Sequence, residues 1–508
     1  MANIISNQNK FLDLFFKIKY SNFIQKLNKF SYSIWSLIFI SFLTLSAYIF
    51  SLEIYFYLFI ALYVVYICLF CDDLLPIVCL FIFCYISPSR ENNPGLNTNS
   101  VFYNLKGTLV LIIAVVCTIS ILSRIIIDKN MGLKKLFTQK KYLLSGMIIL
   151  GIAYILSGIG SKNYGEYFFN NLIFALLQFL SIFLIYFIFS TTIDWKKIPR
   201  FYFSYMCILI GIVASLEIVY IYLTKNVILN GIINRSLLFT GWGTYNNVGA
   251  MIAITIPFAF YLACKKKNNY IYLILATLLL LGTILSCSRG SILGAVVIYI
   301  ISFIVSLFKA DNKKIFWISS SILIIIAIII GLIFFNELIK LFSKVPKIIE
   351  STDGDVKVND SSRFYIYKEG FKAFLKYPIF GQTFYPTNFV PYDFSIIDSF
   401  SSFFPPRWHN TIIQLLSSCG IVGILAYGFH RFQTIKLIIK KPSLEKTFIG
   451  LSILTLLAIS MLDCHMFNIG PTMFYSIALM FAENTKQKED KISFEDLIIQ
   501  DYKNNKKD

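Results

Sequence analysis

Long apolar runs, separated by short polar loops, constrain this chain more than any other feature. Beside the run from Ser31 to Phe50, further runs begin near residues 52, 73, 108, 142, 168, 201, 246, 270, 290, 315, 409, 447 and 466. A helix needs about 20 residues to cross the hydrocarbon core of a bilayer. Hydrophobic residues make up 57% of the chain and charged residues only 14%, whereas soluble domains carry about a quarter charged residues. The sequence therefore predicts an all-α polytopic membrane protein with about fourteen transmembrane helices.

The basic residues between the runs predict the orientation. Lysine and arginine concentrate in alternate loops, on the side of the N-terminus, and such loops face the cytoplasm. We therefore expect a cytoplasmic N-terminal segment (1–30), transmembrane helices one to eleven (31–335), a large outer loop with amphipathic helices (336–408), helices twelve to fourteen (409–482) and a cytoplasmic tail (483–508). The net charge of +19 belongs to these loops, so nucleic acid is not an expected partner.

Neither the cysteines nor the N-terminus suggests additional chemistry. The ten cysteines are scattered within or beside apolar runs and show no metal-binding spacing in a polar loop. We therefore expect no disulfide framework and no metal site. The stretch from Met1 to Phe30 shows no signal-peptide cleavage pattern, so the first span is expected to insert and stay.

The first candidate site is the turn Ser288-Arg289-Gly290, between two spans at the outer face. Arg289 could anchor to lipid headgroups. Its small neighbours favour a second interpretation, in which a large anion approaches the guanidinium closely.

The second candidate site is a helix predicted from Ser361 to about Tyr377, with an N-cap at Asp360 or Ser361 and an end at Pro378. Four aromatic residues are predicted on one face and three lysines on a ridge: Phe364, Tyr367, Phe371 and Phe374, and Lys368, Lys372 and Lys376. Such a helix can lie on the membrane surface. Alternatively, Arg363 binds a pyrophosphate at the helix start, where the helix dipole assists.

The third candidate site is Arg407-Trp408-His409-Asn410, directly before a span. A histidine at such an interface is often structural, but a neutral imidazole there can accept a proton from a sugar hydroxyl. Two acids are further candidates. Glu217 lies within a span, where an acid faces a cavity or a partner, and Asp463 lies at the outer end of a later span.

These sites, in this order, resemble the family of bacterial O-antigen ligases and O-antigen polymerases. The matching motifs are Leu285-Ser286-Cys287-Ser288-Arg289-Gly290, then Ser362-Arg363 with Pro378-Ile379-Phe380-Gly381, then His409-Asn410 with Gln414-Leu415-Leu416 and Gly420-Ile421-Val422-Gly423, and more weakly Asn246-Asn247 with Gly249-Ala250. The resemblance covers about residues 240 to 480. The sequence departs from the family at Gly381-Gln382-Thr383-Phe384, where a second glycine is frequent.

The resemblance implies a multi-pass protein of the bacterial inner membrane with its active site on the outer face. It implies glycan transfer from an undecaprenyl-pyrophosphate-linked oligosaccharide to the hydroxyl of an acceptor glycan, without metal, cofactor or nucleotide sugar. Arg289 and Arg363 would bind the donor pyrophosphate, since guanidinium groups hold such anions bidentately. His409 would be catalytic, with Asp463, Asn410, Arg407 and Glu217 in support; Asp463 could equally assist the histidine, bind sugar or cap a helix.

Three functions remain open from the sequence. We favour a repeat-unit polymerase of O-antigen or capsule, with a chain-length regulator protein as a further partner. The alternative within the family is a ligase that transfers O-antigen to lipid A core. A polysaccharide flippase or transporter is less favoured, because transporters place charged residues in mid-membrane and here they collect at one face.

Overall fold

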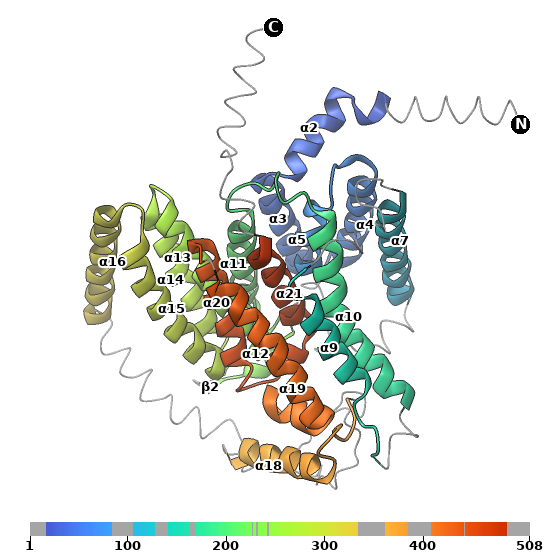
Figure 1. Cartoon of the computed structure of the whole chain (residues 1–508). Helices are drawn as coiled ribbons and strands as arrows, with labels where there is room; N and C mark the ends of the chain where they lie inside the picture. Colours follow the sequence, from blue (N-terminus) through green and yellow to red (C-terminus); the bar gives the residue numbers. More distant parts are fainter. Residues whose placement is uncertain are drawn as a thin grey trace, which may run out of the picture. The chain divides into compact units, whose positions relative to one another are not determined.

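The computed structural model describes residues 17–83, 105–127, 141–161, 168–225, 227–229, 232–240, 243–333, 361–384, 408–440 and 442–484. The predictions for the start of the N-terminal segment, for most of the outer loop and for the cytoplasmic tail lie outside these residues. The described chain is predominantly helical (Figure 1). The chain divides into two compact units, one formed by residues 1–139, 188–209 and 486–508 and the other by residues 140–187 and 210–485.

Every predicted span begins within three residues of the start of a helix. Among the described residues, five segments are long and apolar enough to cross a membrane: Asn171–Thr192, Tyr202–Thr224, Tyr245–Lys265, Arg289–Lys309 and Thr411–Ile439. The bent pair Asn22–Ser31 and Ile34–Phe50, with 74° between its helices, raises this number to six if it acts as one span. An apolar, helical membrane protein is thus confirmed, and fourteen crossings remain a prediction.

The first unit contains α2 (Asn22–Ser31), α3 (Ile34–Phe50), α4 (Glu53–Phe70), α5 (Leu75–Phe83) and α7 (Leu105–Ile127). Arg124 of α7 donates hydrogen bonds to the carbonyl oxygens of Cys68 and Cys71, both at 2.9 Å. These carbonyls belong to the end of α4, where helix carbonyls lack partners of their own. Arg124 therefore caps a neighbouring helix.

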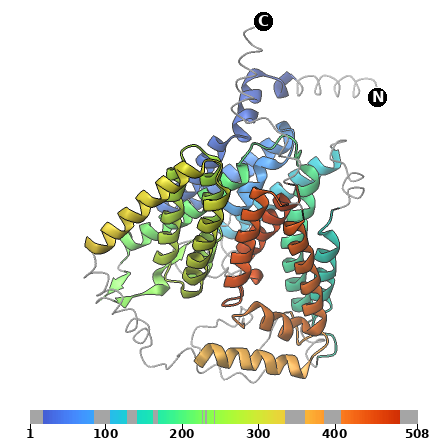
Figure 2. The ribbon, with the colours of Figure 1, turned by 60° about the vertical axis from the view of Figure 1, so that its left-hand side comes forward.

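The second unit contains most of the remaining elements. Its helices are α9 (Leu144–Ile155), α12 (Tyr245–Ala253), α13 (Ile256–Lys265), α14 (Asn269–Leu285), α15 (Arg289–Lys309), α16 (Lys313–Ile333), α18 (Ser361–Lys376), α19 (Thr411–Ile439), α20 (Leu444–Ile459) and α21 (Ile469–Asn484), with the short helices η2 (Arg235–Leu237) and η4 (His465–Phe467). Two long helices, α10 (Phe168–Thr192) and α11 (Tyr202–Thr224), contribute residues to both units. Helices α13 to α16 pack side by side (Figures 1 and 2).

Two short strand pairs accompany the helices of the described residues, whose fold class is all-α as predicted. Between α11 and α12 lie two antiparallel pairs of two-residue strands, β1 (Ile228–Leu229) with β2 (Ile232–Ile233) and β3 (Phe239–Thr240) with β4 (Gly243–Thr244). Strands this short have no apolar alternation that the sequence could reveal.

Helix α19 breaks at Gly420, and the segment after α18 packs into the break. Gly420 has φ 63° and ψ −155°, a conformation open essentially to glycine alone. The carbonyl oxygen of Pro378 accepts from the nitrogen of Ile421 at 2.8 Å, and the nitrogen of Gln382 donates to the carbonyl oxygen of Ser417 at 2.7 Å. The Pro378–Gly381 motif therefore satisfies backbone groups that the kink exposes.

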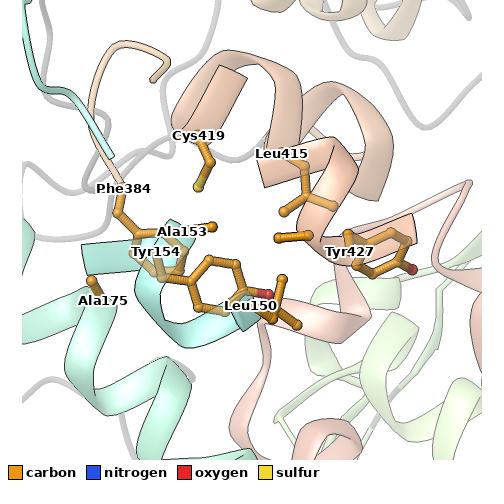
Figure 3. Close-up of a cluster of buried hydrophobic side chains, with 9 residues drawn as sticks. Leu150, Ala153, Tyr154, Ala175, Phe384, Leu415, Cys419 and Tyr427 are labelled. Atoms are coloured by element: carbon orange, nitrogen blue, oxygen red, sulfur yellow. The ribbon is translucent and has the colours of Figure 1, made fainter. Parts of the chain in front are cut away.

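A buried cluster holds this segment in place (Figure 3). Phe384 packs against Tyr154 of α9, with 4.8 Å between the ring centroids, and the cluster continues to Leu415 and Cys419 of α19. Its apolar contacts connect the segment after α18 to three helices of the same unit, α9, α10 and α19. The departure from the family pattern at residues 381–384 thus lies in this packed segment.

Helix α18 lies across the beginning of α19 (Figures 1 and 2). Gly370 makes the contact close, because a Cβ there would lie 2.5 Å from Cγ2 of Ile413 and 2.9 Å from Cδ2 of Trp408. The face toward α19 therefore contains Gly370 and Ala373, whereas Phe371 is exposed. Our prediction of a helix from Ser361 to about Tyr377 was correct.

Candidate active site

His409 lies at the point where the chain enters α19, in a backbone conformation that its neighbours impose. Its φ is 49°, in the left-handed region that non-glycine residues rarely adopt. Next to it, the side-chain oxygen of Asn410 caps α19 by accepting from the nitrogens of Ile412 and Ile413, at 2.9 and 3.1 Å. The hydroxyl of Tyr367 in α18 donates to the carbonyl oxygen of His409 at 3.2 Å. Strained backbone of this kind collects at functional sites.

The imidazole of His409 is paired with Asp463, which follows α20. Nδ1 of the ring lies 3.1 Å from Oδ1 of the carboxylate. Because an ionised carboxylate only accepts hydrogen bonds, Nδ1 carries the proton. In a neutral ring, Nε2 then has the free electron pair and can accept a proton. The side chain of His409 is 30% exposed and that of Asp463 17%, so the pair can be reached from outside.

The surroundings of Asp463 keep its carboxylate ionised. Burial raises its pKa, but the hydrogen bond from His409, the positive charge available on His465 and on His409, and the backbone N–H of Cys464 all lower it. The pKa of Asp463 is consequently held well below its usual range. The carboxylate thus accepts from His409 throughout the neutral pH range, which fixes the orientation of the imidazole.

The second carboxylate oxygen of Asp463 connects the pair to two other elements. Nδ2 of Asn246, in the first turn of α12, donates to Oδ2 of Asp463 at 3.1 Å. Oδ1 of Asn246 accepts from the hydroxyl of Ser288 at 3.0 Å. We call His409, Asp463, Asn246 and Ser288 the polar network. The network joins distant parts of the chain, since Asn246 and Asp463 lie 217 positions apart.

Arg289 comes directly after Ser288 of the polar network. It is the first residue of α15, and its side chain is exposed. The turn before it includes Cys287, whose φ of 57° is again left-handed. Gly249 lets α12 approach this turn, since a Cβ there would lie 2.5 Å from Oγ of Ser286. The small residues of the motif therefore allow close packing against α12. That they also let an anion approach Arg289 stays a prediction.

A second histidine lies beside the polar network. His465 is buried, and its Nδ1 lies 3.0 Å from Oδ1 of Asn247, which also accepts from the side chain of Asn468. The two consecutive asparagines of α12 thus hold different partners, Asn246 the aspartate and Asn247 the histidine. The sequence resemblance included both asparagines, but their chemistry could not be deduced without the tertiary contacts.

The remaining predicted site residues are placed differently. Arg363 is the third residue of α18, but its side chain lies outside the described part of the structure. Arg407 lies outside the described residues altogether. Glu217 is fully buried in α11 and is not part of the polar network. Trp408 is buried between α18 and α19. Within the described ranges, no three His, Cys, Asp or Glu residues could hold a metal ion together.

The apolar helices indicate a multi-pass membrane protein, and its histidine–aspartate pair lies where α19 begins and α20 ends. The family model described as O-antigen ligase matches residues 272–428. This match supports the resemblance to the O-antigen ligase and polymerase family that the motifs predict. It indicates membrane glycosyl transfer of this type. A comparison with curated proteins found no match.

Proposed function

We propose that this protein transfers a glycan from an undecaprenyl-pyrophosphate carrier to the hydroxyl of an acceptor glycan, at the outer face of the bacterial inner membrane. The observation that carries the proposal is the bond between His409 and Asp463. The side chain of Asn246 connects this pair to Ser288, the residue before Arg289. An oriented base and a nearby exposed cation are what such a transfer requires.

The reaction follows from these groups. Nε2 of His409 takes the proton of the acceptor hydroxyl, and the hydroxyl oxygen attacks the anomeric carbon of the donor glycan. The bond between that carbon and the pyrophosphate oxygen breaks, and the carrier pyrophosphate leaves with its electron pair. Arg289, together with Arg363, stabilises the charge that develops on the leaving group. Asp463 stabilises the imidazolium that His409 becomes.

Within this reaction class we favour a repeat-unit polymerase, in which the acceptor is itself a carrier-linked glycan. The printed description of the family, O-antigen ligase, favours the second candidate, in which the acceptor is the lipid A core. The two candidates use the same donor and the same polar network, so they differ only in the acceptor that reaches His409.

Purified protein and a synthetic carrier-linked repeat unit test both candidates. A polymerase incubated with donor alone forms a ladder of longer carrier-linked glycans, whereas a ligase forms product only when lipid A core is added. Absence of any new glycosidic bond with either acceptor would contradict glycosyl transfer. Passage of the intact donor across a vesicle membrane, without such bonds, would indicate a transporter.

A further inference from the structure

We infer that Asn246 is a positioning residue, which holds the Asp463 carboxylate and fixes it relative to the turn that presents Arg289. The inference rests on the proposed function. It concerns an amide that touches neither the acceptor hydroxyl nor the leaving group in the mechanism above. Its role follows from four hydrogen bonds, from the orientation of the amide and from the packing of α12.

The carboxylate of Asp463 is held at both oxygens. Oδ1 accepts from His409 and, at 2.7 Å, from the backbone nitrogen of Cys464. Oδ2 accepts from Nδ2 of Asn246 at 3.1 Å. A carboxylate bound at one oxygen alone can turn about its side-chain bonds. The amide of Asn246 prevents that rotation, and therefore fixes the plane in which the imidazole of His409 lies.

Chemistry determines the orientation of the Asn246 amide. Its NH2 group must face Asp463, because an ionised carboxylate has no hydrogen to donate. Its oxygen then faces Ser288, whose hydroxyl lies 3.0 Å away. Ser288 is itself buried, and its hydroxyl lies 2.8 Å from that of Ser291 one helical turn later. The amide therefore joins the aspartate to the first turn of α15.

Packing makes this connection stiff. Gly249, one turn after Asn246, brings α12 so close to the turn that a Cβ would lie 3.0 Å from Cβ of Ser288. A shift of the turn would therefore break the hydrogen bond to Asn246 or collide with α12. In this arrangement the base at His409 and the cation at Arg289 keep a fixed separation. Groups held in the geometry that the reaction needs react faster, because they do not have to find that geometry in each turnover.

Two substitutions separate positioning from packing. Asn246→Leu keeps most of the side-chain volume but removes both hydrogen bonds, so we expect kcat to fall at least about tenfold, with the KM for the donor nearly unchanged. Asn246→Asp keeps the shape and forms a carboxylate pair with Asp463, which can share one proton at acidic pH. Among the described residues, the titratable groups around the Asn246 amide are Asp463, His409 and His465. Arg289 is the nearest basic residue in the sequence of α15, the helix that packs against α12.

The pH dependence provides the sharper readout. While the proton is shared, Asn246→Asp still offers a donor to Asp463; once the proton leaves, two carboxylates repel each other. The ratio of the Asn246→Asp rate to the wild-type rate should therefore fall several-fold between about pH 5.5 and about pH 8. The same ratio for Asn246→Leu should stay flat. Taking the ratio to the wild-type rate removes any pH dependence that the variants share with the wild type.

A buried asparagine remote from the site serves as the matched control. Oδ1 of Asn269 accepts from the hydroxyl of Ser319 at 3.0 Å, at the opposite end of α14 from Ser286. Asn269→Leu should leave kcat and its pH dependence unchanged. Normal turnover by Asn246→Leu, or an Asn246→Asp ratio that does not vary with pH, would overturn the inference. If the wild-type protein makes no glycosidic bond, the proposed function fails instead.

Discussion

Nδ1 of His409 lies 3.1 Å from Oδ1 of Asp463, although 54 positions separate the two residues in the chain. The pair forms because α19 begins where α20 ends: the backbone nitrogen of Thr411 donates to the carbonyl oxygen of Ser460 at 3.0 Å, and Nδ2 of Asn410 donates to that of Met461 at 2.9 Å. These two hydrogen bonds bring the ends of the helices together, and the bond between the imidazole and the carboxylate completes the pair.

Substitution of Asp463 tests the importance of the pair. Asp463→Asn keeps the shape, but its amide can donate to Nδ1 and so favour the wrong tautomer of His409. We expect a loss of about 10²–10⁴-fold in kcat, the range typical of general-base catalysis. The matched control is Asp311→Asn, since Asp311 is exposed and pairs with Lys265 at 2.8 Å, away from the polar network. Equal losses in both variants would contradict a special role for Asp463.

Acidification tests the same pair through stability. Because the pKa of Asp463 is lowered in the folded protein, its contribution is complete above the unfolded value of about 4 and is lost as the pH falls through the lower folded value. The difference in melting temperature between wild type and Asp463→Asn should therefore not shrink between about pH 7 and about pH 5. A difference that disappears within that interval would show that the carboxylate is not held in its ionised form.

Lysine substitutions test the binding of the pyrophosphate. Arg289→Lys keeps the charge but loses the planar fork that grips two oxygens, so we expect a large loss of transfer. Arg363→Lys should behave in the same way. Arg200→Lys is the control, because Arg200 lies in a loop predicted on the opposite face and contacts the ring of Phe201. Rates of polysaccharide synthesis at equal protein levels measure the effect, and normal synthesis by both site variants would reject the assignment.

Two glycines of α19 test the contact between the segment after α18 and the kink. A Cβ at Gly420 would lie 2.4 Å from the carbonyl oxygen of Ile379, and its φ is 63°. Gly420→Ala should lower the melting temperature of the solubilised protein strongly, because clash and backbone strain add. Gly428 has no atom within 4 Å of its Cβ position, so Gly428→Ala should be neutral or slightly stabilising. Similar melting of both variants would contradict the docking of residues 378–382.

Accessible cysteines test the orientation in the membrane. In a protein without native cysteines, Lys376→Cys should react with an impermeant thiol reagent in cells whose outer membrane has been opened, since α18 is predicted outside. Asp311→Cys, which is also exposed but lies in a loop predicted inside, should react only after lysis. The reverse pattern would invert the topology.

The sequence predicts the helices well and the site only in part. Apolar run length sets where helices begin, so even the broken segment of α12 and α13 was located. The motifs around His409 and Arg289 indicate two elements of the candidate site, and the sequence proposes Asp463 as a partner of His409 among other roles. Asn246 and Ser288 were only parts of motifs, because their hydrogen bonds depend on how α12, α15 and α20 pack. The burial of Trp408 under α18 likewise depends on a tertiary contact.

Turnover of His409→Ala is the most direct test of the proposed chemistry. With a synthetic carrier-linked donor and purified protein, this variant should still bind donor but lose transfer by about 10²–10⁴-fold. His430 is the control: it is buried and its Nε2 lies 3.0 Å from the hydroxyl of Tyr475, so His430→Ala should lower the yield of folded protein but not the turnover per folded molecule. Near-normal turnover by folded His409→Ala would remove this residue from the mechanism.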